Sequence, residues 1–222
     1  MMNRHMNRRT LGQWLGRCAV AVTLTAGLGS VGSLGIAFAA DEAPDALITR
    51  VSTGVLDTIK ADKALANDIN KIMVLVDAKI MPSVNFARMT ASAVGPGWRQ
   101  ATPEQQKRLQ EEFKTLLVRT YSGALAQVSD QTVFVKPTRL AADDKEVTVR
   151  TEIRGRNDPI QLDYRLEKGA DSNWKIYNLN VLGVWLVETY RSQFAQEINA
   201  NGIDGLIKVL ADRNKANAAR KG

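Results

Sequence analysis

The sequence has 222 residues, 45% of them hydrophobic, with six prolines and a formal net charge of +7. This length and apolar content suit one domain with a sizeable core. Residues 1–39 hold four arginines and no acidic residue, so residues 40–222 keep 26 basic and 23 acidic residues. The resulting net charge of +3 argues against a nucleic-acid binder, because such a protein needs clustered Lys and Arg to offset many phosphates.

Residues 1–39 have the pattern of an export signal. A basic segment precedes the uncharged, glycine-dotted run 18–39, which ends in Ala37-Phe38-Ala39. This predicts a Sec-type signal peptide that is cleaved after Ala39. Two alternatives stay open: a permanent transmembrane anchor, since 22 uncharged residues could just span a bilayer, and twin-arginine export through Arg8-Arg9.

Residues 40–222 contain neither Cys nor His, because Cys18 and His5 lie in the predicted signal peptide. This excludes a Ser-His-Asp triad, a Cys nucleophile, a zinc site built on His or Cys, a His-ligated haem and a disulfide framework. An enzyme would need a pair such as Asp163 with Tyr164, or Glu188 with Tyr190. We expect Asp163 on the solvated face of a strand and Glu188 on the polar side of a helix, so we predict no catalytic site and no metal.

The first half of the exported chain reads as helical. Apolar residues recur every three or four positions from Asp45 to Ile59, from Ile69 to Pro82 and from Phe86 to Ala93. The segment Thr102–Gln105 then combines an N-cap Thr, a Pro at the first helical position and a Gln that closes a capping box. It predicts a long helix that continues to Leu125.

The second half changes to a period of two. Apolar and polar residues alternate in four segments, at 132–136, 147–154, 160–166 and 174–181. Short connections rich in turn residues join them, which predicts an antiparallel meander with one covered and one solvated face. Beyond Gly183 a helical pattern returns; it ends at Asn201-Gly202 and is followed by a second helix.

These patterns predict an α+β fold. N-terminal helices and two C-terminal helices cover one face of a strongly curved antiparallel sheet of about four strands. The predicted domain spans 40–213, between the signal peptide 1–39 and a flexible tail at 214–222. The residues alone leave open whether sheet and helices pack solid or enclose an apolar cavity.

Several short stretches, in order along the chain, resemble the MlaC (toluene-tolerance) family of periplasmic phospholipid-binding proteins. They are Pro82–Phe86, Gly97-Trp98, Ala101–Gln106, Phe113–Tyr121, Trp174–Tyr177, Leu182–Val184, Tyr190–Phe194 and Gly202–Leu206. The chain departs from the family pattern at Trp185, where Ser is common, and at Asn85, where Asp is common.

The resemblance implies a periplasmic, monomeric shuttle that encloses phospholipid in an apolar cavity and helps to maintain outer-membrane lipid asymmetry. Its partners would be an outer-membrane lipoprotein–porin complex and an inner-membrane ABC transporter with an MCE-domain subunit. It would need no cofactor and bind no nucleic acid, the phospholipid being cargo. The residues we expect to line the cavity and contact lipid are Phe113, Leu117, Tyr121, Val147, Val149, Ile153, Leu162, Tyr164, Trp185, Tyr190 and Phe194.

Two functions of other classes stay open at this point. The chain could be an interaction module that tethers partners and holds no lipid. It could also be a His-free enzyme on the same α+β scaffold.

Overall fold

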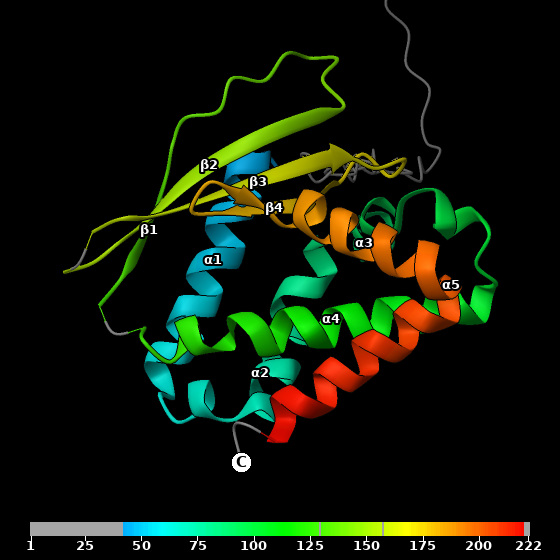
Figure 1. Cartoon of the computed structure of the whole chain (residues 1–222). Coiled ribbons are helices and arrows are strands. Elements are labelled where there is room, and N and C mark those ends of the chain that lie inside the picture. Colours follow the sequence, from blue (N-terminus) through cyan, green and yellow to red (C-terminus); the bar gives the residue numbers. More distant parts are fainter. Residues whose placement is uncertain (1–41, 129, 157, 220–222) are drawn as a thin grey trace, which may run out of the picture. The chain divides into compact units, whose positions relative to one another are not determined.

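The structure, a computed structural model, describes residues 42–128, 130–156 and 158–219 (Figure 1). The predicted signal peptide lies outside these residues. None of the helices that are described is both long and apolar enough to cross a membrane. The helices are α1 (Pro44–Ala61), η1 (Leu65–Asn67), α2 (Ile69–Leu75), η2 (Val76–Ile80), η3 (Met81–Ser83), α3 (Phe86–Val94), η4 (Gly95–Arg99), α4 (Pro103–Leu125) and α5 (Leu186–Ala219).

The sheet is an antiparallel meander whose five strands lie side by side in chain order. They are β1 (Thr132–Val135), β2 (Glu146–Arg154), β3 (Ile160–Lys168), β4 (Trp174–Val181) and β5 (Val184–Trp185). The predicted α+β fold is therefore confirmed, with one strand more than expected. The sequence pattern did not reveal β5, because a strand of two residues shows no alternation.

The turn between β4 and β5 consists of Leu182 and Gly183, with φ of 52° and 87°. Two successive left-handed residues form the tight kind of hairpin turn whose twist matches that of the flanking strands. Leucine adopts this conformation at a cost, because its Cβ approaches the following carbonyl oxygen.

The N-terminal helices follow the predicted boundaries closely. The predicted second helix is divided: α2 continues into a π-helical segment, η2, and then into one 3-10 turn that contains Pro82. Helix α4 begins with the predicted capping box, in which Thr102 and Gln105 each bond the other's backbone N–H. Asn85 is the N-cap of α3, since its side chain accepts a hydrogen bond from the backbone of Arg88.

Helix α5 is two helical halves joined at Gly202, where φ is 72°. The two halves fold back on each other, and both lie along α4 (Figure 1). The second half continues through Ala219, past the point where the sequence predicts a tail. Asn214 is buried, and its amide donates to the backbone oxygen and the carboxylate of Glu112 on α4.

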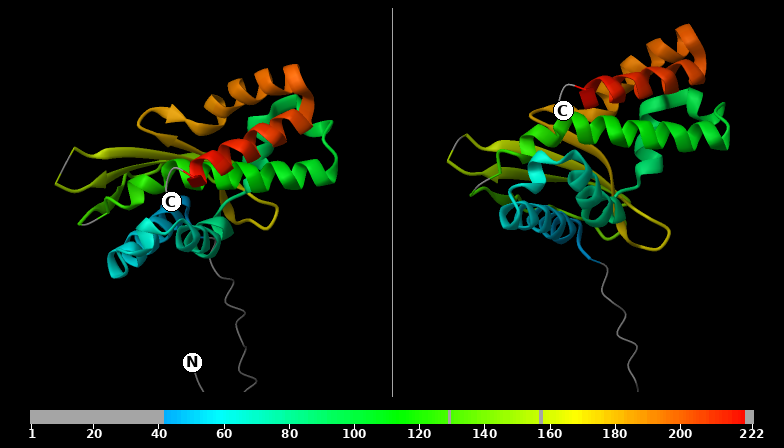
Figure 2. Two further views of the ribbon diagram at one scale, coloured as in Figure 1. Left: turned by 60° about the horizontal axis from the view of Figure 1, so that its bottom comes forward. Right: turned by 90° about the horizontal axis from the view of Figure 1, so that it is seen from below.

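Helix α4 lies between α5 on one side and α1 with α2 on the other (Figure 2). On the α5 side the core is aromatic: the ring of Phe113 is 5.0 Å from that of Tyr190 and 5.2 Å from that of Phe194, edge to face. On the other side α1 packs against the sheet, where Ile48 and Val149 are fully buried.

One expectation about the sheet was wrong. Asp163 lies on the outer face of the sheet, opposite the helical layer, and we expected this face to be solvated. Asp163 is nevertheless buried, with 7% of its surface exposed. Its neighbours in register are Arg150 on β2 and Asn180 on β4. Gln161 donates a hydrogen bond to one of its carboxylate oxygens.

Candidate functional site

An apolar cavity of about 410 Å³ lies between the inner face of the sheet and helices α1 to α4. Its volume falls within the roughly 300–1,000 Å³ typical of ligand pockets. Helix α1 contributes Val51 and Val55, α2 and η2 contribute Ile72 and Val76, and α4 contributes Leu117. The wall residues from the sheet are Val133, Ile153, Ile160, Leu162, Tyr164, Ile176, Leu179 and Val181.

A bulge in β4 makes the sheet wall continuous. Leu179 pairs with Tyr164, whereas Ile176 pairs with Leu166, so Tyr177 is an extra residue in β4. In a regular strand Ile176 and Leu179, which are three positions apart, would point to opposite faces. With the bulge, both side chains line the cavity.

Few polar side chains reach the wall. Among the described residues that line it, only Ser52, Lys114, Tyr121, Ser122 and Tyr164 carry polar side-chain groups. Burial raises the pKa of the Tyr164 phenol, and hydrogen bonding to Ser52 and Thr151 opposes this shift. The phenol therefore stays neutral near pH 7, so the inner wall carries no charge at this position.

The cavity opens between α4 and the start of β3. Tyr121 and Ile160 both line the cavity, yet 37% and 44% of their surfaces are exposed. Lys114 is the cationic residue of the described wall, and its ammonium lies 2.8 Å from the Asp77 carboxylate of η2. The ion pair joins α4 to η2 and neutralises the charge of Lys114.

The structure brings five of the eleven predicted lipid-contacting residues together in the cavity wall. They are Leu117, Tyr121, Ile153, Leu162 and Tyr164. They come from α4, β2 and β3, which shows that the apolar faces of these elements were assigned correctly.

Six predicted residues do not line the cavity. Phe113, Tyr190 and Phe194 fill the contact between α4 and α5, where three rings leave no free space between them. Val149 is fully buried against α1, and Val147 packs against the same cluster. These five side chains point inward, as inferred from the sequence, but they lie in the solid core and do not line the cavity.

Trp185 is the sixth, and its expected orientation was wrong. It pairs with Asn180 in β5 and therefore points to the outer face of the sheet. There the guanidinium of Arg165 lies 3.9 Å from the centre of its ring. The sequence pattern predicted a helix beyond Gly183, whereas Trp185 lies in a strand and its direction follows the alternation of that strand.

Sequence reasoning missed the wall formed by α1 and α2. Val51, Val55, Ile72 and Val76 lie on the apolar helix faces that the sequence revealed, but none of them was among the residues expected to contact lipid. Their periodicity shows that they point inward, but periodicity holds no information about whether a partner fills the space opposite.

Nothing in this arrangement offers a metal centre: within the described parts of the chain, no three or more His, Cys, Asp or Glu residues are grouped so as to hold a metal ion. Asp163 and Tyr164 point to opposite faces of β3, and Glu188 is bonded to Arg165 and Asn178. The two candidate acid–base pairs are therefore not assembled in one pocket.

Comparison with known proteins agrees with a ligand-binding cavity. The MlaC protein family matches residues 49–212, which is most of the chain and includes every residue of the cavity wall except Ile48. The chain belongs to the MlaC family. Within this family it is 31% identical over 175 residues to toluene tolerance protein ttg2D of Pseudomonas putida, a match that covers 74% of this chain and 77% of the relative.

Two further similar proteins have names that refer to phospholipid. The intermembrane phospholipid transport system binding protein MlaC of Haemophilus influenzae is 25% identical over 172 residues, covering 76% of this chain and 80% of the relative. A solved phospholipid-binding protein from Ralstonia solanacearum, in complex with a phospholipid, is 46% identical with a TM-score of 0.76. That match covers 81% of this chain and 99% of the solved chain.

Proposed function

We propose that this MlaC-family protein is a periplasmic phospholipid-binding shuttle between the outer and inner membranes. The observation that carries the proposal is the apolar cavity that opens beside Tyr121 and Ile160. The phospholipid bound to the related protein of Ralstonia solanacearum supports the class of cargo. Export by the signal peptide 1–39 would deliver the domain 40–213 to the periplasm.

The physical need for such a container is large. Burying each CH₂ group stabilises by roughly 0.8 kcal/mol, so two acyl chains of about 15 carbons disfavour free diffusion by on the order of 20 kcal/mol. A carrier must match this apolar environment, and lipid must pass directly between docked partners. The wall of aliphatic side chains provides the environment, and no nucleotide is needed at this step.

We propose that acyl chains contact Leu117, Tyr121, Ile153, Leu162 and Tyr164. The head group would remain at the opening in water, because Lys114, the cation among the described wall residues, is already paired with Asp77. Binding should therefore depend weakly on head-group identity. Such a carrier would serve lipids that differ in their head groups and share their acyl chains.

The proposed partners are an outer-membrane lipoprotein–porin complex and an inner-membrane ABC transporter with an MCE-domain subunit. Exchange with both would maintain the lipid asymmetry of the outer membrane. The protein acts as a binding protein in this scheme, and energy is supplied at the transporter.

Native purification followed by solvent extraction and mass spectrometry tests the proposal. A carrier retains phospholipid in near-stoichiometric amount, with several head groups represented. A protein that only tethers partners yields no lipid, and an enzyme on this scaffold yields a small polar ligand or nothing. Either of the last two results would contradict the proposal.

A further inference from the structure

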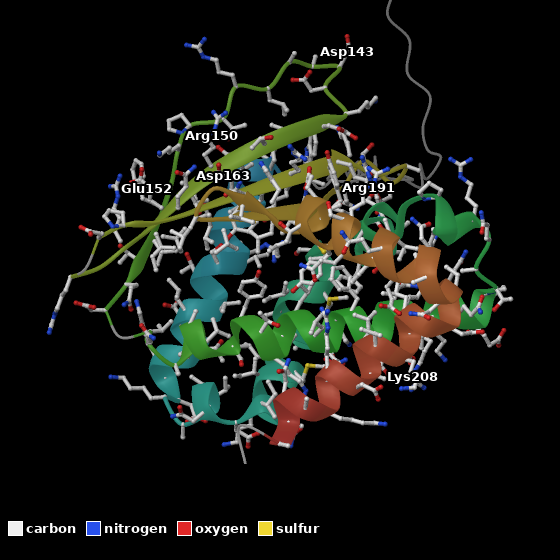
Figure 3. The ribbon with its side chains drawn as sticks, viewed as in Figure 1. Asp143, Arg150, Glu152, Asp163, Arg191 and Lys208 are labelled. Carbon is white, nitrogen blue, oxygen red and sulfur yellow. The ribbon has the colours of Figure 1, made fainter. Side chains whose placement is uncertain are left out.

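A second pocket, of about 340 Å³, lies where the end of α3, the η4 turn and the first half of α5 meet. Trp98, Arg99, Arg191 and Ser92 are among its lining residues. None of the residues that line it also lines the apolar cavity. The pocket is therefore separate from the proposed lipid site. Figure 3 labels Arg191, which belongs to the first half of α5.

The pocket is positively charged. Among the described residues that line it, two carry guanidinium groups and none carries a carboxylate. In the described chain neither Arg99 nor Arg191 forms an ion pair or a side-chain hydrogen bond, and both residues are exposed. Several other arginines in the described chain are paired, such as Arg50 with Glu42 and Arg165 with Glu188.

The local fold explains part of this arrangement. Gly95 is the C-cap of helix α3 and has a φ of 70°; a Cβ at this position would lie 3.5 Å from Nε of Arg191. A cation beside the C-terminus of a helix is favourable because the last carbonyl groups carry partial negative charge. This interaction accounts for Arg191, but it does not require a second unpaired cation, Arg99, at the same pocket.

We infer that this pocket is a docking site for an acidic segment of a second protein. Guanidinium groups bind carboxylates through two parallel hydrogen bonds. The half-buried Trp98 adds apolar contact area, and Trp and Arg are the residues that contribute most to protein interfaces. A hollow accepts a projecting side chain of a protein loop, whereas a bilayer surface is flat. The inference goes beyond the lipid cargo and does not depend on it.

The test is a nuclear magnetic resonance titration that follows the indole N–H of Trp98, assigned with Trp98→Phe. The probes are a hexaglutamate peptide, a hexaglutamine peptide and vesicles that contain phosphatidylglycerol. Hexaglutamate should shift the Trp98 signal, hexaglutamine should not, and added salt should weaken the effect. Arg99→Gln and Arg191→Gln should each weaken binding by about fivefold or more.

Lys208→Gln is the matched control. It removes one positive charge from the other half of α5, well apart from Arg191 in Figure 3, and breaks only an exposed pair with Asp212. If Arg191→Gln lowers the melting temperature of the protein, its effect on binding is not interpreted, and the binding measured with Arg99→Gln decides the test. The inference is overturned if hexaglutamate leaves Trp98 unshifted, if Lys208→Gln weakens binding as much as Arg99→Gln, or if only the vesicles move the signal.

Discussion

Leu162 and Leu109 both point into the interior, but only Leu162 lines the cavity. Leu109 on α4 is fully buried in the solid core. Removing methyl groups from such a core leaves a void that the surroundings refill only in part. A wall residue already has free volume on one side, so its truncation creates little new cavity surface.

We therefore predict that two matched substitutions differ in their effects on stability and on lipid content. Leu109→Ala should lower the free energy of unfolding by about 2–5 kcal/mol and leave the lipid content of the folded protein unchanged. Leu162→Ala should cost clearly less in the lipid-free protein and should alter how much lipid is retained. Urea denaturation of stripped protein and lipid extraction measure the two quantities. Equal losses of stability with unchanged lipid content would exclude Leu162 from the wall.

At the scale of elements, the start of α4 is fixed by hydrogen bonds that also reach α5. The Thr102 hydroxyl accepts from the backbone of Gln105 at 3.2 Å, and the Gln105 side-chain oxygen accepts from the backbone of Thr102 at 2.9 Å. The amide of Gln105 also donates to Asp204 at 2.8 Å. One residue thus caps α4 and holds it to the second half of α5.

Thr102→Ala removes an acceptor from the N-terminus of α4. It should reduce the free energy of unfolding by about 1 kcal/mol, within the roughly 0.5–2 kcal/mol of such caps. Thr115→Ala, in the middle of the same helix, is the control, since its hydroxyl only bonds back to the carbonyl of Glu111. Thermal or urea denaturation measures both, and an equal loss in the two variants would argue against the capping role.

Glu188 connects the first half of α5 to the sheet. Its carboxylate accepts hydrogen bonds from Arg165 on β3 and Asn178 on β4, at 2.5 and 2.8 Å. Burial raises the pKa of Glu188, but the hydrogen bonds from Asn178 and Arg165 outweigh it and hold the pKa below the ordinary 4.5. The unfolded chain consequently binds this proton more readily than the folded protein.

The stability that Glu188 contributes is fully present above about pH 4.5 and is lost as the pH falls through the lowered pKa of the folded state. Urea denaturation should give a lower free energy of unfolding at about pH 3.5 than at about pH 7. In Glu188→Gln this difference between the two pH values should be smaller. Glu146 keeps part of the effect in this variant, because hydrogen bonds from Arg88 and Tyr177 also lower its pKa. Identical pH profiles for both proteins would contradict this account.

For the molecule as a whole, the sequence predicted the elements better than the space between them. The alternation in β2 and β3, the capping box at Thr102 and the break at Gly202 depend on neighbours within a few residues, and all three are as predicted. Facing inward is likewise a local property, so Leu162 and Phe194 were both expected inside.

Whether an inward side chain meets a partner or free volume depends on segments far apart in the chain. Phe194 meets Phe113, which lies 81 positions earlier, and the two rings fill the contact between α4 and α5. Leu162 faces Leu117 and α1 across free volume. The outward direction of Trp185 depends on its pairing with Asn180 in a two-residue strand, which no periodicity reveals. The similar protein solved with a bound phospholipid supports a filled cavity where the sequence pattern gives no information.

The central claim is that lipid occupies the cavity between the sheet and α1 to α4, and photo-cross-linking tests it most directly. Protein loaded with a phospholipid that has a diazirine near the end of one acyl chain is irradiated, digested and analysed by mass spectrometry. The account predicts that cross-links fall on wall residues such as Val55, Ile153 and Leu162. Cross-links confined to the outer face of the sheet, around Arg165 and Trp185, would contradict it.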